Sequence, residues 1–397
     1  MTTVSTETST ESAADLIAGY RPGSSSLFAS PRGTLLAEGT YFAVPPSGRR
    51  DALGDLDRRV QAVLGVAEAA GHEVRAVVGA VPFAPDAHAQ LVVPMRLRRT
   101  GPAGTTEPVR IRRQGITALH PVPPADRYAA AVDRAVHQIG AGHYTKVVLA
   151  RSVRAEAPGF DPAPVVRALA AREPSGYTFG IDLGNGRTLF GASPELLVSR
   201  HGRQVAAHPL AGSAARSADP AEDARRAAAL LRSEKDRHEH AVVARAVADA
   251  LAPFCAQLSV PPEPALVRTA TMWHLGTLVT GTVADPATSA LTLAAALHPT
   301  PAVCGTPTAA ARAAIGELEP FDRGFYTGMV GWVDAAGDGE WAVTIRCAVA
   351  DPGGLDLFAG AGIVAGSDPA AELAETSAKL GTMLAALGLA AEHGNVA

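Results

Sequence analysis

The pattern of apolar and polar positions divides the first third of the chain into short elements. Residues 53–70 carry the apolar spacing of a helix. Three apolar runs between Gly and Pro residues predict β-strands at 39–44, 74–79 and 90–94. Residues 98–106 are expected to form a loop, and the proline-rich segment 121–124 is expected to form a stiff connector. No residue in this part points to catalysis.

From Asp126 onward, helical and strand-like patterns alternate. Helices are predicted at 129–139, 164–173, 217–251, 291–297 and 369–387. Strands are predicted at 146–151, 177–181, 188–190, 272–283, 330–333, 341–349 and 355–358. We expect 330–333 and 341–349 to pair across the turn at 335–338. Pairs of strands separated by helices predict an α+β fold in one body rather than a doubly wound parallel sheet.

The composition argues against two classes of partner. Of the 397 residues, 47% are apolar, which is enough for a sizeable core. No apolar run approaches the roughly 20 residues of a membrane span, so no membrane partner is expected. The net charge of -4, without a basic block, argues against a nucleic-acid partner, because such a protein needs a positive surface to neutralise phosphates.

The N-terminal segment and the cysteines favour the cytoplasm. Residues 1–23 are predicted to be a disordered tail, which begins with a Thr-, Ser- and Glu-rich stretch. This stretch lacks the basic start and apolar run of a signal peptide. The chain has 3 cysteines and no C-x-x-C pair. An odd count argues against a disulfide framework or a cysteine zinc site and fits a reducing compartment.

The last predicted helix carries a suggestive polar face. Ser367-Asp368-Pro369 is a helix-start signal, since a capping side chain precedes a proline. Glu372, Glu375 and Lys379 then lie on one side of the helix. Taken alone, this face is more typical of a surface ion pair. The glycine-rich segment 359–366 favours function, because close-set glycines between a strand and a helix N-terminus suit backbone contact with an anion.

Two further charged residues share faces with apolar ones. Glu239 stands one step before the apolar stripe of a helix, which consists of Val243, Val247 and Leu251. Its carboxylate would be desolvated there unless a cation such as magnesium compensates it. A carboxylate at the helix start, just outside the core, is an equally good interpretation. Lys146 shares a strand face with Val148 and Ala150, where it is either a buried general base or an edge residue that limits aggregation.

Two residues in the β-rich part can be interpreted either as functional groups or as ordinary surface residues. Glu195 follows the turn at 191–194 and precedes apolar residues. A protonated carboxyl there would serve as a general acid, although a surface glutamate at a turn is the simpler interpretation. Arg346 lies in the predicted strand 341–349, on the face that carries small side chains. That face leaves room for a carboxylate bound by the guanidinium fork, or it faces solvent.

Seven segments, in order, resemble the chorismate-utilising enzymes, a family that includes anthranilate, aminodeoxychorismate, salicylate and isochorismate synthases. They are KVVLAR at 146–151, ASPE at 192–195, PLAGS at 209–213, SEKDRHEH at 233–240, LHPTPA at 297–302, GFYTG at 324–328, and the segment 360–379. The resemblance extends from about Asp126 to Leu387, and it is only loose in the N-terminal part.

The resemblance implies one α+β body with a large antiparallel β core flanked by helices. Residues 24–118 would form the N-terminal portion of this fold, and residues 119–392 the chorismate-binding catalytic domain. The site would bind Mg2+ through Glu239 and Glu375, with Glu372 close by. The positions that match substrate contacts or line the family's site are Gly212, Ser213, His274, Ala302, Tyr326, Arg346, Gly360, Gly362 and Lys379.

Within the family, the resemblance is strongest to the isochorismate synthases. Relatives that use ammonia or eliminate pyruvate usually carry Thr in place of Ala302. Lys146 matches the base that activates a water for attack on C2 of chorismate, and Glu195 matches the acid that protonates the departing 4-hydroxyl. Isochorismate would then serve siderophore (2,3-dihydroxybenzoate) or salicylate biosynthesis. The expected protein is a cytoplasmic monomer without an obligatory glutaminase subunit.

Three alternatives stay open at this point. A bifunctional salicylate synthase would share Lys146 and Glu195 but would also release pyruvate. An ammonia-using subunit of the anthranilate or aminodeoxychorismate synthase type is disfavoured by Lys146 and Ala302. An inactive relative that serves as a binding or scaffold protein is disfavoured by the complete set of acid, base and metal positions.

Overall fold

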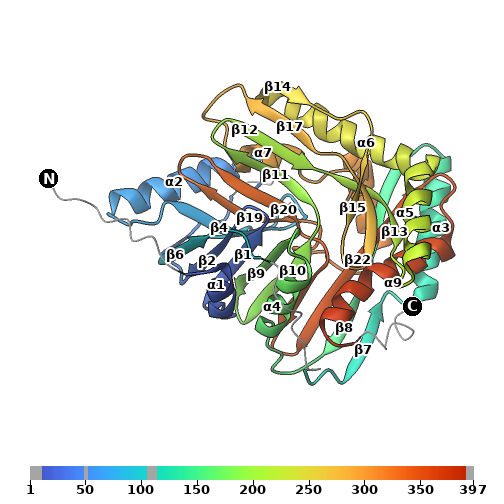
Figure 1. The fold of residues 1–397 in the computed structure, drawn as a ribbon, viewed down its shortest axis with the longest axis horizontal. Helices are drawn as coiled ribbons and strands as arrows, with labels where there is room; N and C mark the ends of the chain where they lie inside the picture. Colours follow the sequence, from blue (N-terminus) through green and yellow to red (C-terminus); the bar gives the residue numbers. More distant parts are fainter. Residues whose placement is uncertain (1–10, 49–51, 105–113, 390–397) are drawn as a thin grey trace.

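Two large antiparallel β-sheets form the centre of the molecule, and helices lie around them (Figure 1). The computed structural model describes residues 11–48, 52–104 and 114–389. Within these ranges the first sheet has the order β18 (Gly305–Thr306), β8 (Lys146–Glu156), β22 (Gly354–Val364), β21 (Cys347–Asp351), β10 (Arg187–Ser193), β9 (Tyr177–Gly184), β1 (Ser25–Ser30), β2 (Gly33–Glu38) and β6 (Arg96–Thr100), and β7 (Ala118–Val122) also pairs with β8.

The second sheet lies against the first, and a small third sheet stands beside them. The second sheet has the order β14 (Cys255–Ser259), β17 (Val279–Val283), β12 (Gln204–His208), β11 (Leu196–His201), β20 (Gly339–Val343), β19 (Met329–Asp334), β4 (Ala76–Val81), β5 (Gln90–Val93) and β3 (Phe42–Ala43). The third sheet consists of β13 (Leu210–Ala215), β16 (Met272–Gly276) and β15 (Ala265–Arg268). N-terminal strands therefore share sheets with C-terminal ones, so the chain folds as one body.

The apolar core has an inner layer and two outer layers. Phe28 and Phe179 of the first sheet belong to the same buried cluster as Val78 and Val330 of the second sheet, so the inner faces of the sheets pack together. The outer face of the first sheet packs under α1 (Ala13–Gly19), α4 (Ala163–Arg172) and α9 (Pro369–Ala386). The outer face of the second sheet packs under α2 (Leu56–Ala69), α6 (Glu234–Leu251) and α7 (Ala290–Leu297).

The remaining helices complete the cover around β8 and the third sheet. α3 (Ala125–Gly140) and α8 (Thr308–Leu318) pack beside β8 in a separate cluster, and α5 (Pro220–Arg232) packs on β13. No helix in the described ranges combines the length and the apolarity that crossing a bilayer requires. The arrangement confirms the predicted α+β fold with a large antiparallel core and flanking helices.

The prediction of a disordered tail at 1–23 is wrong for the residues that the structure describes. Ser12 and Asp15 form a reciprocal capping box at the start of α1, and Leu16 is buried against the first sheet. Residues 1–10, at the start of the predicted tail, and 390–392, at the end of the predicted catalytic domain, lie outside the described residues.

The expected loop at 98–106 and the expected connector at 121–124 are also wrong in part. Residues 96–100 form β6, which pairs with β2, and residues 118–122 form β7, which pairs with β8. The strand predicted at 39–44 is reduced to β3. In each case pairing with a distant strand decides the conformation, and the local sequence does not show it.

Three elements near the site differ from their predicted form. The helix expected at 217–251 is divided at Ser233, whose hydroxyl accepts a hydrogen bond from the Asp236 N–H and caps α6. The strand expected at 341–349 is divided into β20 in the second sheet and β21 in the first. The glycine-rich loop expected at 359–366 is mostly strand, because β22 continues to Val364 along its whole pairing with β8.

Candidate active site

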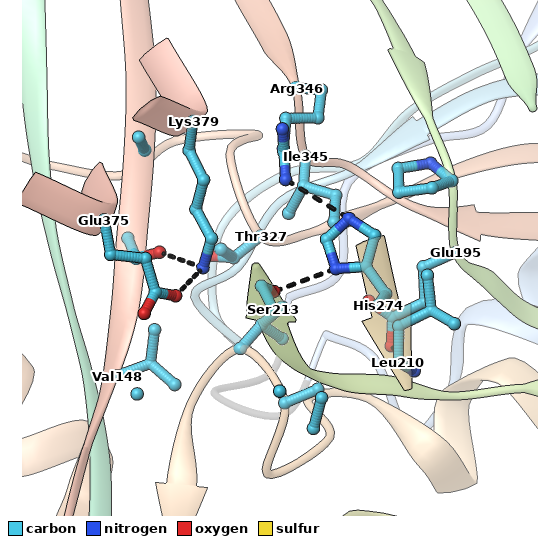
Figure 2. Close-up of a pocket in the computed structure, with 18 of the residues that line it drawn as sticks. Val148, Glu195, Leu210, Ser213, His274, Thr327, Ile345, Arg346, Glu375 and Lys379 are labelled. Carbon is cyan, nitrogen blue, oxygen red and sulfur yellow. Dashed lines mark hydrogen bonds and ion pairs between the residues drawn. The ribbon is translucent and has the colours of Figure 1, made fainter. Parts of the chain in front are cut away.

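A pocket of about 680 Å³, a volume that includes its open mouth, lies where β8 and β22 of the first sheet meet β13 and β16 of the third sheet, α6 and α9 (Figure 2). The predicted site residues that line it are Glu195, Gly212, Ser213, Glu239, His274, Ala302, Tyr326, Arg346, Gly360, Gly362, Glu375 and Lys379. The other two, Lys146 and Glu372, are not lining residues, but both are buried and each forms an ion pair with a neighbouring residue. Segments far apart in the chain therefore converge on one cavity.

Helix α9 supplies one wall of the pocket. The Asp368 carboxylate accepts a hydrogen bond from the Ala371 N–H, so the predicted helix start is confirmed. Lys379 Nζ lies 2.6 Å from Glu375 Oε1 and donates to the Gly360 carbonyl at 2.9 Å. The expected ion pair between these residues thus exists, but it lines the pocket instead of the outer surface (Figure 2).

Beside β22, Lys146 of β8 contacts Glu239 of α6. Lys146 is the first residue of its strand and is only 3% exposed, so the interpretation as an edge residue in solvent is wrong. Its Nζ lies 2.8 Å from Glu239 Oε1. Burial alone would raise the pKa of Glu239, but Lys146, Lys379 and a further lysine outweigh it and lower that pKa.

Glu372 lies one turn before Glu375 on the same side of α9. It is 2% exposed, and Lys235 of α6 approaches it with 3.3 Å between Nζ and Oε1. Burial raises the pKa of Glu372, and the charge of Glu375 raises it further. Lys235 opposes both effects, and the two carboxylates repel each other.

Glu195, in the short connection between β10 and β11, is a buried acid. It is 2% exposed, so the interpretation as a surface glutamate at a turn is wrong. Loss of hydration raises its pKa to about 8, against the opposing effects of the Leu210 N–H, Lys146 and Lys379. The carboxyl group is therefore protonated at neutral pH and has a proton to donate.

A chain of hydrogen bonds fixes Arg346 on another wall. Its Nη2 approaches His274 Nε2 at 3.5 Å, and His274 Nδ1 lies 2.8 Å from Ser213 Oγ (Figure 2). Burial, together with the charges of Arg346 and Lys379, lowers the pKa of His274 well below its usual value, so the ring is neutral. The network assigns an accepting Nε2 and a donating Nδ1.

The predicted environment of Arg346 is wrong in its geometry. Arg346 does not lie on a strand face but in the break between β20 and β21, with a φ of 51°. It is 7% exposed, so neither a solvated outer face nor a strand lined by small residues describes its surroundings.

Gly360 and Gly362 keep the floor of the pocket open. A Cβ atom on Gly360 would lie 2.9 Å from Tyr326 Oη, and one on Gly362 would lie 2.6 Å from Glu239 Oε1. Both glycines lie in β22, so they do not form the expected glycine-rich loop before a helix N-terminus. They are needed instead because side chains from other elements approach the strand closely.

The sequence did not single out several lining residues. The additional ones are Val148, Pro194, Leu210, Ala211, Val303, Thr327, Ile345, Phe358 and Ala359. Thr327 has a φ of 59°, an unusual conformation for a β-branched residue that no local sequence signal predicts. Phe358 stacks on the ring of Tyr326 with 5.1 Å between centroids. Most of these residues contribute shape, which a sequence read for charge and periodicity does not show.

The carboxylates in and beside the pocket fit a divalent cation in their chemistry. Glu239, Glu372 and Glu375 are hard oxygen ligands, and each lies next to a lysine ammonium in this structure. The described ranges contain no preformed group of three or more His, Cys, Asp or Glu ligands. Mg2+ needs only one or two carboxylates when water or substrate oxygens complete its octahedron, so this donor set is sufficient in kind.

Comparisons with known proteins agree with the geometry. The sequence profile of the family described as "Chorismate binding enzyme" matches residues 97–388. The isochorismate synthase DhbC of Bacillus subtilis (strain 168) is 50% identical over 394 residues, which are 97% of this chain and 98% of that protein.

Two solved structures share the fold. A Bacillus anthracis structure, described as "putative 2,3-dihydroxybenzoate-specific isochorismate synthase, DhbC", superposes with a TM-score of 0.89 at 48% identity, and the alignment covers 95% of this chain and 100% of that one. Anthranilate synthase component I of Streptococcus pneumoniae TIGR4 superposes with a TM-score of 0.73 at 22% identity over 89% of this chain and 92% of that one, which shows the common fold alone.

Proposed function

The chain belongs to the chorismate-binding enzyme family, and we propose that it is a magnesium-dependent isochorismate synthase. The observation that carries the proposal is the buried, protonated Glu195 in a pocket that is also lined by Glu239, the ion-pair partner of Lys146. An exchange of hydroxyl groups by addition of water needs both an acid and a base, and these residues supply one of each. The names of the 50% and 48% identical relatives support the same activity.

In the proposed reaction, Lys146 and Glu195 move the protons. Lys146 Nζ accepts a proton from the water whose oxygen attacks C2 of chorismate, while the ring double bond shifts and the C4–O bond breaks. Glu195 gives its proton to the departing hydroxyl, which leaves as water. One water enters and one leaves, so substrate and product are isomers. In this structure Lys146 Nζ lies 2.8 Å from Glu239 Oε1, so the proposed base stands directly beside a carboxylate of the site.

We assign Mg2+ to Glu239 and Glu375, with Glu372 in a supporting position. When bound, the ion supplies positive charge for a carboxylate of the substrate. Burial is the main cause of the raised pKa of Glu372, and the repulsion from Glu375 that adds to it supports a cation at this place. A calorimetric titration of Mg2+ into the protein tests the assignment, because Glu239→Gln and Glu375→Gln should each lower the affinity and a remote charge change such as Glu263→Gln should not.

The substrate contacts follow from the positive and neutral donors of the pocket. Arg346 and Lys379 are the two cationic side chains that line it, and chorismate carries two carboxylates. Tyr326, Ser213 and His274 are neutral hydrogen-bonding groups suited to the hydroxyl and ether oxygens. The backbone of Gly360 and Gly362, the space at Gly212 and the small side chain of Ala302 leave room for the ring.

The decisive experiment is incubation of the purified protein with chorismate and Mg2+, with products separated by chromatography. Isochorismate as the main product, lost on addition of EDTA and restored by excess Mg2+, supports the proposal. Salicylate with an equal amount of pyruvate would indicate the bifunctional alternative. Anthranilate or aminodeoxychorismate, formed only when ammonium is supplied, would indicate the ammonia-using alternative. No turnover under any condition would favour an inactive binding protein.

The proposed place of the product is 2,3-dihydroxybenzoate synthesis for a siderophore. The Bacillus anthracis relative, 48% identical, is named as specific for this compound. We further propose a monomer in the cytoplasm that works without a glutaminase subunit. Size-exclusion chromatography with light scattering tests the monomer. Turnover by the single purified chain without ammonium tests the independence from a glutaminase subunit.

A further inference from the structure

We propose that Thr382 of α9 is a positioning residue for Arg346, and that Thr271 in turn holds Thr382. The hydroxyl of Thr382 fixes the orientation in which the guanidinium receives a carboxylate of the substrate. The inference deepens the proposed function and rests on it for the choice of substrate.

Arg346 depends on few contacts for its orientation. Its side chain is buried, and it has no ion pair among the described residues; Glu375, whose charge acts on Arg346, is paired with Lys379 instead. Its Nη1 donates to Thr382 Oγ1 at 3.0 Å, whereas its Nη2 approaches His274 Nε2 only at 3.5 Å. The contact with Thr382 is therefore the shorter of the two that fix the plane of the fork.

Thr382 is itself held from the other side. Its Oγ1 lies 2.7 Å from Thr271 Oγ1, in the turn between β15 and β16. A hydroxyl has one proton and two lone pairs, so Thr382 accepts from Arg346 and still pairs with Thr271 in either direction. The neighbouring Ala270 N–H donates to Glu173 Oε1 at 3.1 Å, which ties this turn to the loop after α4.

Thr382 acts on the pocket only through Arg346. It is not among the residues that line the pocket of Glu195 and Lys379, but it lines a second cavity of about 450 Å³. Arg346 lines both cavities and forms part of the wall between them. Loss of the Thr382 hydroxyl would leave a buried N–H of a charged group without a partner, which favours rotation of the guanidinium away from its binding orientation.

The test compares Thr382→Val, which keeps the shape, with Thr382→Ser, which keeps the hydroxyl. A contact made equally in the bound substrate and in the transition state changes KM and leaves kcat unaltered. With chorismate and saturating Mg2+, we expect KM to rise roughly tenfold in Thr382→Val, with kcat within about threefold of wild type. Thr382→Ser should keep KM within about twofold. Thr271→Val should raise KM in the same direction by a smaller factor.

Thr376 offers a matched control on the same helix. It is fully buried, and its hydroxyl donates to the Leu373 carbonyl at 2.9 Å instead of to Arg346. Thr376→Val should therefore leave KM unchanged. In an Arg346→Lys background, Thr382→Val should add less than about a twofold rise in KM, because its effect passes through the guanidinium.

The outcomes separate this inference from the proposed function. If the wild-type protein converts chorismate and Thr382→Val has an unchanged KM, this inference is overturned and the proposed function stands. The inference is also overturned if Thr382→Ser raises KM as much as Thr382→Val does, or if Thr376→Val raises KM equally. Either result indicates a merely structural role. If Thr382→Val does not fold, the KM of Thr271→Val and of Thr382→Ser decides. A wild-type protein without chorismate turnover overturns the proposed function and this inference together.

Discussion

Glu195→Gln should remove the proton donor of the proposed reaction and leave the shape of the pocket unaltered. The wild-type carboxyl is 2% exposed, and burial raises its pKa to about 8. Its nearest hydrogen-bond donor, the Leu210 N–H, stands at 3.5 Å and only partly offsets the burial. At pH 7 the group is mostly protonated. Loss of a general acid typically costs about 10²–10⁴-fold in rate, and we expect kcat to fall by that factor.

The same pKa gives the pH dependence its sign. Wild-type kcat should be constant from neutral pH to nearly pH 8 and should then fall about tenfold per pH unit, as Glu195 ionises and loses its proton. Glu195→Gln has no such proton, so its residual rate should lack this alkaline fall. A pH profile of kcat at saturating chorismate and Mg2+ measures both. A wild-type profile without an alkaline fall, or a variant that retains it, would refute the role of Glu195.

Stability provides a second, independent measurement of the same group. A native pKa of about 8 against 4.5 in the unfolded chain means that the native state binds the proton more tightly. This contribution is fully present below pH 4.5 and is lost as the pH rises through 8, and the complete difference is on the order of 5 kcal/mol. Glu195→Gln removes this dependence. Between pH 5 and pH 8.5 the urea midpoint of wild type should therefore fall relative to that of the variant; parallel curves would contradict the burial argument.

Three further substitutions test separate parts of the structure. Lys146→Ala should lower kcat by about 10²–10⁴-fold at saturating Mg2+, measured by product formation; a rate near that of wild type would exclude it as the base. In Gly362→Ala the new Cβ would lie 2.6 Å from Glu239 Oε1, so the carboxylate has to move and calorimetry should show roughly tenfold weaker Mg2+ binding. Gly316→Ala, at an exposed position in the last turn of α8 with no atom near the added carbon, should instead raise the free energy of unfolding by about 0.5–1 kcal/mol in urea titrations and leave Mg2+ binding unchanged.

The sequence predicted the elements whose signals are local. The start of α9 follows from Asp368 and Pro369, and the face that carries Glu375 and Lys379 follows from helical spacing. Thr382 continues that face, seven residues after Glu375, and the same spacing would have found it. The buried stripe of α6 was also visible, because Val243, Val247 and Leu251 repeat at every fourth position. In such cases neighbouring residues in the sequence are also neighbours in the structure.

The parts that were not predicted depend on partners distant in the sequence. β6 and β7 are extended because β2 and β8 pair with them, although their own sequences are typical of a loop or connector. Gly360 and Gly362 were assigned to a loop, yet β8 extends β22 through them. Glycine is needed at these positions because Tyr326 and Glu239 approach them from other elements, and this approach exists only in the folded molecule.

The largest error of sequence interpretation falls where the chemistry is concentrated. A continuous strand over 341–349 would place Arg346 on a regular face, whereas the chain leaves the second sheet after β20 and enters the first at β21. At this crossover the Thr327 N–H donates to the Thr344 carbonyl at 2.7 Å, and both Thr327 and Arg346 have a left-handed backbone. Such conformations cost on the order of 1–3 kcal/mol each for residues other than glycine. Packed surroundings stabilise them here, and the result is a guanidinium that points into the pocket instead of along a sheet face. Local rules fail at this point because the crossover conformation, which the local sequence disfavours, is the one that completes the site.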